Sequence, residues 1–314
     1  NTVVGDEAGT AITTGDQNTL IGSISGDAIT TGTNNSAIGR NSLGSLTTGT
    51  GNSAFGTASL TTETTGNYNT AVGISALQTL NNTGDGYNTA VGADAGKLVT
   101  TGVQNTLIGG LAGDAITTAS YNTAVGKSAL GANTTGATNT AVGTGSLASN
   151  TTGDNNTAVG VNALQVNTTG ANNVAMGANA LDSNTTANDN TAVGHASLSA
   201  NTTGASNTAV GKGALDANTT ASNNTAVGHA SLGANTTGTQ NVAVGTFALD
   251  ANTTADFNTA VGYDALTTNT TGSGLVAVGR QALNANTTGA QNTALGLNAM
   301  LSNTTGASNV AVGH

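Results

Sequence analysis

The chain has 314 residues but only 5 Lys and Arg and 15 Asp and Glu, which gives a net charge of −10. It has 46 Gly, no Pro, Cys or Trp, and only 4 Tyr and 3 Phe, whereas an ordinary globular domain is about 25% charged and nearly half apolar; too few large side chains remain for one wide core, which argues against most enzyme folds. The sequence contains no stretch of about 18 apolar residues, the length needed to span a membrane. The absence of Cys excludes disulfides, Fe–S clusters and thiolate zinc sites. The excess of acidic residues argues against a nucleic-acid ligand.

A 17-residue repeat runs through the chain. Asn recurs at its start, and we call this Asn position 0 of each coil; Gly always follows at position 4. One coil carries two extra residues within 80–87, and Leu275 once replaces the Asn. Disordered low-complexity sequence does not keep such a register, and a fixed period is the signature of stacked repeats. We therefore predict one solenoid domain over residues 1–314, without linkers.

The coil of 122–138 represents the repeat, Asn-Thr-Ala-Val-Gly-x-x-Ala-Leu-x-x-Asn-Thr-Thr-Gly-x-x. Helical repeats need about 33 to 47 residues and leucine-rich repeats at least about 20, so two short strands and two turns fit best. We predict an all-β parallel β-solenoid of about nineteen coils. The first strand is expected at positions 0–3 and the second at about positions 7–11. The structural positions of the representative coil are Asn122, Val125, Gly126, Ala129, Leu130, Asn133 and Gly136.

Alternation along the first strand indicates which side chains face inward. Position 3 is apolar, as at Val125, which predicts that positions 1 and 3 are buried or semi-buried. Position 2, usually Ala, then points the other way, and a strand that is apolar on both faces calls for cover on both. Position 7 is always Ala or Ser, as at Ala129, which predicts a close approach to another backbone.

The side chains at positions 8 and 11 vary in size in a compensating way. Most coils combine a large apolar residue at position 8 with Asn at position 11, such as Leu130 with Asn133. Four coils instead have Gly at position 8 and a β-branched residue at position 11: Gly9 with Ile12, Gly26 with Ile29, Gly96 with Val99, and Gly113 with Ile116. Because packed interiors leave few voids, both positions are predicted to reach the same interior space.

The core of each coil is thin. Fixing one residue costs roughly 1–2 kcal/mol of backbone entropy, whereas burying one Leu and one Val returns only about 3–6 kcal/mol. Stacked backbone hydrogen bonds and ladders of identical Asn must contribute. Because the first strand is apolar on both faces, association between chains is expected to supply further stability. We expect a side-by-side homotrimer.

The first strand also carries a family resemblance. The segments Asn173–Gly177, Asn241–Gly245 and Asn309–Gly313 resemble the Asn-Ser-Val-Ala-Ile-Gly repeats of trimeric autotransporter adhesin heads of the Yersinia adhesin-like type. The full unit also looks like repeats in tail-fibre-like proteins of phages and bacteria. Over essentially the whole chain, the resemblance implies a left-handed β-roll, three chains side by side, and an adhesive or fibrous role. The adhesin repeats are usually shorter, and the family's anchor, stalk and neck do not occur here.

Aromatic and cationic side chains recur at two surface positions. Four aromatic residues immediately precede position 0, and they could contact a glycan or simply cover a turn: Tyr68, Tyr87, Tyr121 and Phe257. His195 and His229 both lie at position 5, two coils and roughly 10 Å apart, too far to share a metal ion within one chain. Three copies could bring them together in a trimer, although a solvated turn is the simpler interpretation.

No other pattern indicates chemistry, so we predict neither catalytic nor metal-binding nor cofactor-binding residues. Asp residues gather at position 9, but the Gly-Gly-x-Gly-x-Asp signature of calcium-binding rolls does not occur. The Asn-Thr-Thr triplets match glycosylation acceptors formally, as a composition rich in Asn and Thr produces. No nucleophile–base pair, phosphate loop or paired carboxylates are recognisable.

These observations favour a structural or adhesive extracellular fibre at a cell surface or on a virion. Its expected partners are copies of itself and an unidentified surface, glycan or host protein, with no nucleic acid; end-to-end stacking and a longer fibre are also expected. The alternative is an ice-binding Thr-rich solenoid, against which the burial expected for Thr at position 1 counts. An enzyme built on a β-helix would need acidic or aromatic clusters interrupting the repeat, and the only interruption is the two residues near 81–86.

Overall fold

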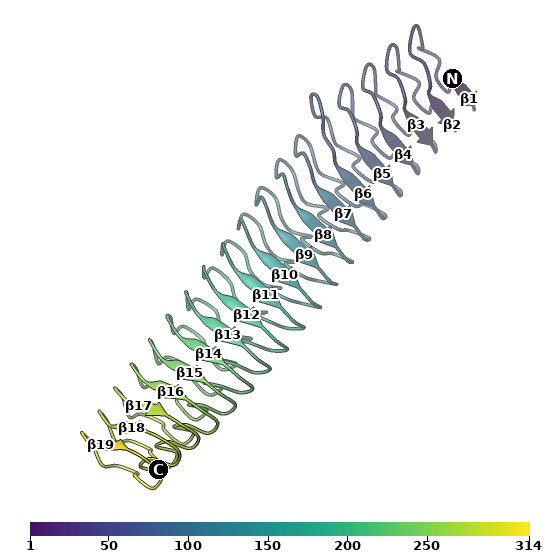
Figure 1. Cartoon of the computed structure of the whole chain (residues 1–314). Helices are drawn as coiled ribbons and strands as arrows, with labels where there is room; N and C mark the ends of the chain where they lie inside the picture. The colour runs from purple at the N-terminus through teal and green to yellow at the C-terminus, as the bar shows by residue number, and fades with distance from the viewer. The chain divides into compact units, whose positions relative to one another are not determined.

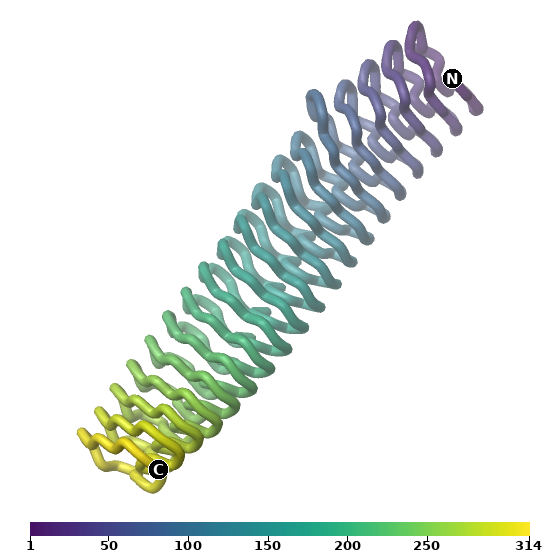
Figure 2. The backbone as a smooth tube through the Cα atoms, viewed as in Figure 1, coloured from purple at the N-terminus to yellow at the C-terminus, as the bar shows by residue number.

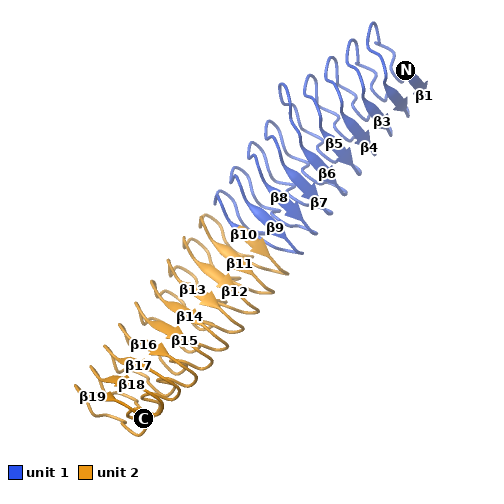
Figure 3. Cartoon of the chain, viewed as in Figure 1, with its two compact units in different colours: residues 1–156 blue, residues 157–314 orange.

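The computed structural model describes residues 1–314 and contains nineteen β-strands and no helix (Figure 1). Contacts group the chain into two units, residues 1–156 and 157–314 (Figure 3). Each unit is a stack of 17-residue coils, and each coil contributes one three-residue strand at positions 1–3. The backbone repeats the same winding from coil to coil (Figure 2).

In the first unit, consecutive strands pair in parallel with identical positions opposite each other, as Thr2 opposite Thr19. The strands are β1 (Thr2–Val4), β2 (Thr19–Ile21), β3 (Ser36–Ile38), β4 (Ser53–Phe55), β5 (Thr70–Val72), β6 (Thr89–Val91), β7 (Thr106–Ile108), β8 (Thr123–Val125) and β9 (Thr140–Val142).

The second unit follows the same rule, for example with Thr191 opposite Thr208. Its strands are β10 (Thr157–Val159), β11 (Val174–Met176), β12 (Thr191–Val193), β13 (Thr208–Val210), β14 (Thr225–Val227), β15 (Val242–Val244), β16 (Thr259–Val261), β17 (Val276–Val278), β18 (Thr293–Leu295) and β19 (Val310–Val312). The predicted all-β parallel β-solenoid is confirmed.

The predicted second strand does not form. Positions 5–10 make a run of turns, because positions 6 and 8 are left-handed: φ is 54° at Ser128 and 56° at Leu130. A segment in which every second residue has a left-handed backbone cannot form a β-strand, which requires negative φ at each residue. The turn segments still stack, since the amide of Leu130 donates to the carbonyl of Ser146 at 3.0 Å. Complete burial of the Leu130 side chain offsets the unfavourable conformation.

The two faces of the strand are the reverse of those predicted. Ala124 at position 2 is fully buried, whereas Thr123 and Val125 at positions 1 and 3 point outward and are partly exposed. The small Ala faces inward because the large side chains of positions 8 and 11 already fill the narrow interior. The outer side of the sheet therefore carries the Val, Ile, Phe, Met and Leu residues of position 3.

The predicted sharing of space between positions 8 and 11 is confirmed, and position 2 joins them. A Cβ on Gly26 would lie 2.8 Å from Cδ2 of Leu20 at position 2 and 2.9 Å from Cδ1 of Ile29 at position 11. Neighbouring coils also contribute, since a Cβ on Gly96 would lie 2.6 Å from Cδ1 of Leu107, in the next coil. Bulk missing at one position is thus supplied by another.

Two ladders of Asn side chains hold the coils together. At position 0, the Asn139 amide donates to Oδ1 of Asn122 at 2.9 Å, while Nδ2 of Asn122 donates to the carbonyl of Gly136 at 3.1 Å. At position 11, Nδ2 of Asn150 donates to Oδ1 of Asn133 at 2.8 Å. All these Asn are buried, and buried polar groups are stabilising only when they are hydrogen-bonded. The expected Asn ladders are confirmed.

Backbones approach closely at position 4, and the close approach predicted at position 7 is also present. Gly126 has φ of 136°, and a Cβ there would lie 2.6 Å from the carbonyl oxygen of Gly143 in the next coil. The position-7 residue Ala129 is fully buried. Where this residue is Ser, as at Ser146, its Oγ donates to the carbonyl of Gly143 at 2.8 Å. Only Gly at position 4 and a small residue at position 7 fit.

Candidate functional site

The repeat is interrupted once, in the coil of β5, where the turn projects beyond its neighbours (Figure 1). The backbone N–H of Asn81 donates to the carbonyl of Thr100 at 2.8 Å, and the backbone N–H of Gln104 donates to the carbonyl of Gly86 at 2.7 Å. These bonds place Asn81 at position 12 and Gly86 at position 15. The two additional residues are therefore accommodated within 82–85.

A buried carboxylate lies beneath this projecting turn. Glu63, at position 11 of the preceding coil, is fully buried. Its Oε1 accepts the backbone amides of Thr64, Thr65 and Gly66 at 3.0, 3.2 and 2.7 Å. The side-chain nitrogen of Asn82, turned toward Glu63, donates to Oε2 at 2.6 Å.

Comparison with a regular coil explains this arrangement. There, the corresponding amides of Thr13, Thr14 and Gly15 all donate to the position-12 carbonyl of the next coil, that of Thr30, at 3.0–3.2 Å. The Glu63 carboxylate takes the place of that carbonyl next to the insertion. Burial raises the pKa of Glu63, and its backbone hydrogen bonds oppose the rise. Sequence reasoning missed this residue, although it is the only charged side chain at position 11.

Two of the four predicted aromatic contacts, Tyr68 and Tyr87, lie on the surface beside the projecting turn. The rings of Tyr68 and Tyr87 stack, with centroids 5.3 Å apart and planes 9° from parallel. Tyr68, Tyr87 and Tyr121 are 46%, 52% and 56% exposed. Tyr121 lies two coils beyond Tyr87, with Gln104 at the same position between them, whereas Phe257 belongs to the second unit.

Polar groups of the projecting turn surround Tyr87. Its hydroxyl donates to Oδ2 of Asp85 at 3.2 Å, and Nδ2 of Asn67 donates to Oδ1 of Asp85 at 3.1 Å. Partial desolvation and the Asp85 carboxylate raise the pKa of Tyr87, so its hydroxyl stays a neutral donor. On the other side of the stack, the Tyr68 ring lies over Gly51, where a Cβ would lie 2.7 Å from Cδ1 of the ring.

The two predicted histidine contacts are exposed turn residues two coils apart. His229 meets the Phe247 ring edge-on, with centroids 5.3 Å apart. Burial raises the pKa of Asp250, and His229 opposes that rise. No group of three or more His, Asp or Glu side chains lies close enough to hold a metal ion, so neither His195 nor His229 belongs to a metal-ligand cluster within the chain.

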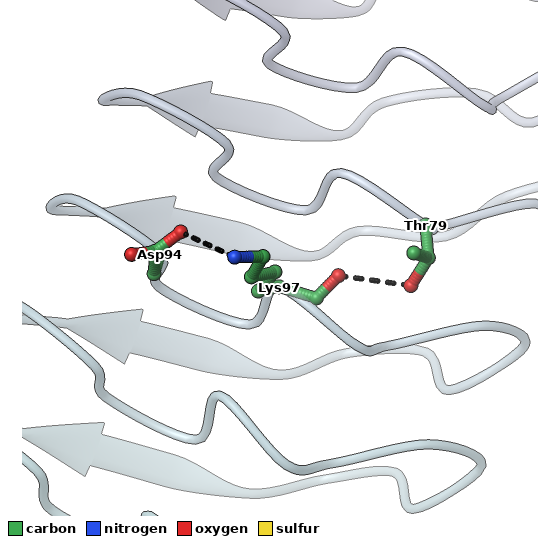
Figure 4. Close-up of polar contacts among 3 residues, drawn as sticks. All are labelled: Thr79, Asp94 and Lys97. Carbon is green, nitrogen blue, oxygen red and sulfur yellow. Dashed lines mark hydrogen bonds and ion pairs between the residues drawn. The ribbon is translucent and has the colours of Figure 1, made fainter.

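One surface ion pair is formed, between Nζ of Lys97 and Oδ1 of Asp94 at 3.1 Å (Figure 4). The Lys97 carbonyl also accepts a hydrogen bond from Oγ1 of Thr79 in the preceding coil at 2.8 Å. Burial raises the pKa of Asp114, one coil further on, and the Asp94 carboxylate adds to the rise. Exposed ion pairs contribute about 0–1 kcal/mol, so this group is a local feature of the turn.

The Asn-Thr-Thr triplets are poor glycosylation acceptors in the folded chain. Asn133 is fully buried, and its Nδ2 donates to the carbonyl of Gly136 at 2.8 Å. Asn252 and Asn286 are buried in the same way. A glycan on any of them would break the position-11 ladder.

The outward-facing side chains of positions 1 and 3 form a surface that we call the strand face. Position 3 supplies its apolar residues, and those away from the terminal strands are half-buried to 47% exposed. No charged residue occurs at either position in any coil. The Thr and Val of neighbouring coils stand in register along the sheet.

No pocket opens on the surface, and no membrane-crossing helix is present. Comparison with protein-family models and with curated proteins gives no match. The strand face and the surface around the projecting turn are the two distinctive surfaces of the chain.

Proposed function

We propose that the chain is a segment of a structural and adhesive extracellular fibre whose left-handed β-solenoids associate side by side as homotrimers. The observation that carries this proposal is the strand face, where an uninterrupted apolar row stands outside the core. Contiguous exposed apolar surface marks sites of association, and the centres of protein interfaces are depleted of charge. The second copy would cover the row that the chain itself leaves open.

The adhesive part of the proposal follows from repetition. Consecutive coils present equivalent side chains at steps of about 4.8 Å, the spacing of neighbouring strands. Weak contacts with a repetitive surface then sum to strong attachment. Such a fibre would function at a cell surface or on a virion, without catalysis and without a bound cofactor.

Light scattering with chemical cross-linking tests the association. We expect the wild-type chain to be a trimer at micromolar concentration, and the triple variant Val193→Lys, Val210→Lys and Val227→Lys to be a folded monomer. The matched control places Lys at an exposed position of the same three coils: Thr203→Lys, Thr220→Lys and Thr237→Lys. The control should remain trimeric; a monomeric wild-type chain would refute the proposal.

A second candidate function is ice binding, which the reversed strand faces favour. Thr at position 1 is outward and partly exposed instead of buried, so the strand face presents Thr-x-Val in register from coil to coil. A regular array of hydroxyl and methyl groups can match an ice lattice. Thermal hysteresis at millimolar protein, lost in the three Val→Lys substitutions and kept in the Thr→Lys control, would support this function, and its absence in the wild-type chain would exclude it.

A further inference from the structure

Aromatic residues concentrate at one place on this chain. The chain has only four Tyr and three Phe. Three of the tyrosines, Tyr68, Tyr87 and Tyr121, occupy position 16 in four successive coils, with Gln104 as the remaining member. Elsewhere position 16 is polar or Gly, with Phe257 as the single further aromatic residue. This cluster coincides with the only interruption of the repeat.

The backbone at position 16 disfavours these side chains. φ is 57° at Tyr68, 49° at Tyr87 and 63° at Tyr121, in the left-handed region where Asn and Gly are preferred and a bulky residue is an outlier. Packing offsets only part of this cost, because Tyr68, Tyr87 and Tyr121 are each about half exposed. Position 16 has the same left-handed backbone in other coils, as at Gln17 and Asn34, so the repeat sets the conformation, and what distinguishes these three coils is a large aromatic residue in place of a small or polar one.

The projecting turn adds polar groups beside the rings. Asp85 is oriented by Asn67 and by the hydroxyl of Tyr87, and its carboxylate retains acceptor capacity toward solvent. An aromatic face packs against the C–H face of a pyranose ring, while a carboxylate and an amide bind its hydroxyl groups. Tyr87 and Tyr121 are the more exposed tyrosines, at 52% and 56%, whereas Tyr68 lies between Gly51 and Tyr87.

The spacing of the rings fits an extended sugar chain. Tyr87 and Tyr121 are two coils apart, which corresponds to about 9.6 Å at the strand spacing of a parallel sheet. That separation is close to the length of one disaccharide in a β-1,4-linked glycan. Alternate sugar rings of such a chain could therefore meet equivalent tyrosines.

We propose that Tyr87, Tyr121 and Asp85 bind an extended β-1,4-linked glycan along the outside of the first unit. This inference rests on the proposed adhesive function and names the class of ligand for it. Tyr68 is a positioning residue, because it supports the Tyr87 ring from below. Gln104 lies between the two ring contacts and supplies an amide to the sugar that spans them.

Intrinsic tyrosine fluorescence and calorimetry test the proposal, since the chain has no Trp and three of its four tyrosines lie here. We expect saturable binding of cellohexaose or chitohexaose up to millimolar concentration. Tyr87→Asn and Tyr121→Asn should each weaken binding at least tenfold without lowering the melting temperature, because Asn suits position 16. The matched control, Phe257→Asn in the second unit, should bind as the wild-type chain does.

Two results would overturn the proposal. One is the absence of saturable binding by either oligosaccharide. The other is a lower melting temperature in Tyr87→Asn with binding intact, which would assign the tyrosines to covering a turn. Light scattering on the same samples separates this inference from the fibre proposal, because a trimer that binds no sugar refutes only the former, and a monomer that binds sugar refutes only the latter.

Discussion

Leu107 occupies the space that a side chain at Gly113 would need: a Cβ on Gly113 would lie 2.8 Å from Cδ2 of Leu107. The two residues stand at positions 2 and 8 of one coil, where most other coils have Ala and Leu. The interior volume of a coil is thus kept while the residue that supplies it changes. Close packing requires this, because voids and overlaps both cost stability.

A double-mutant cycle at this pair should show strong coupling. Leu107→Ala should lower the free energy of unfolding by about 2–4 kcal/mol through the cavity that it leaves. Gly113→Leu alone should cost about 1–3 kcal/mol through overpacking. The double variant recreates the usual Ala and Leu combination and should recover most of the loss in urea unfolding. Additive losses would contradict the shared interior.

Restoring the broken Asn ladder should stabilise the second unit. The Leu275 amide donates to Oδ1 of Asn258 at 2.9 Å, but Leu offers no side-chain acceptor to the amide of Asn292. Leu275→Asn supplies that acceptor in a side chain of similar size, and we expect a gain of about 0.5–1.5 kcal/mol. Thermal unfolding measures the gain. The reverse change, Asn258→Leu, is the control and should destabilise the fold.

Glu63 should make stability depend on pH in a defined direction. Because burial raises the pKa of Glu63 in the folded chain, the folded state holds the proton more tightly than the unfolded state. The resulting stability is fully present below the unfolded pKa of about 4.3 and is lost as pH rises through the folded pKa. Glu63→Gln should remove this part of the dependence, and an unchanged difference between the two proteins across the range would contradict it.

A second variant tests the role of the Glu63 carboxylate itself. Glu63→Leu introduces the residue that neighbouring coils carry, at Leu46 and Leu80, but leaves three backbone amides without their acceptor. Each unpaired buried group costs about 1–3 kcal/mol, so a loss of several kcal/mol is expected. Deleting Asn82 and Asp85 restores a 17-residue coil and should rescue Glu63→Leu. Urea unfolding measures whether the deletion restores the free energy of unfolding. If it does not, the Glu63 carboxylate does not replace the position-12 carbonyl as the acceptor of these amides.

The Gly at position 4 should be far less replaceable than other glycines. Gly126→Ala would combine φ of 136° with a contact of 2.6 Å to a backbone oxygen, and we expect a loss of at least about 3 kcal/mol. Gly213 has φ of 65° and no neighbour within 4 Å of an added Cβ. Gly213→Ala should therefore cost only about 1–2 kcal/mol. Similar melting temperatures for the two variants would contradict this difference.

The repeat, the Asn ladders and the interior shared by positions 8 and 11 follow from the sequence, because each depends on what recurs at a fixed spacing. The direction of the strand side chains does not. Thr123, Ala124 and Val125 are too few for alternation to separate inside from outside when both faces are small or apolar. The small size of Ala124 was the better indicator, since the narrow interior admits little else there.

The conformation of the turn segment at positions 5–10 and the buried carboxylate of Glu63 could not be predicted from the sequence either. Leu130 has a left-handed backbone that its residue type disfavours, and only stacking against neighbouring coils makes that conformation accessible. Glu63 depends on where the insertion displaces a carbonyl. The meeting of Tyr68 and Tyr87, by contrast, follows from register alone, because both stand at position 16 of consecutive coils. The position of Asp85 beside these rings could not be predicted in the same way, because it depends on the conformation of the projecting turn.

In-register stacking has an evolutionary consequence. Each coil meets the next through identical positions, as Asn139 meets Asn122, so a duplicated coil finds suitable partners on both sides at once. Recombination between repeats can therefore lengthen or shorten such a chain by whole coils without creating a new interface. The number of coils can therefore change with little structural cost, whereas a residue without a repeated counterpart, such as Glu63, depends on the one irregular coil beside it.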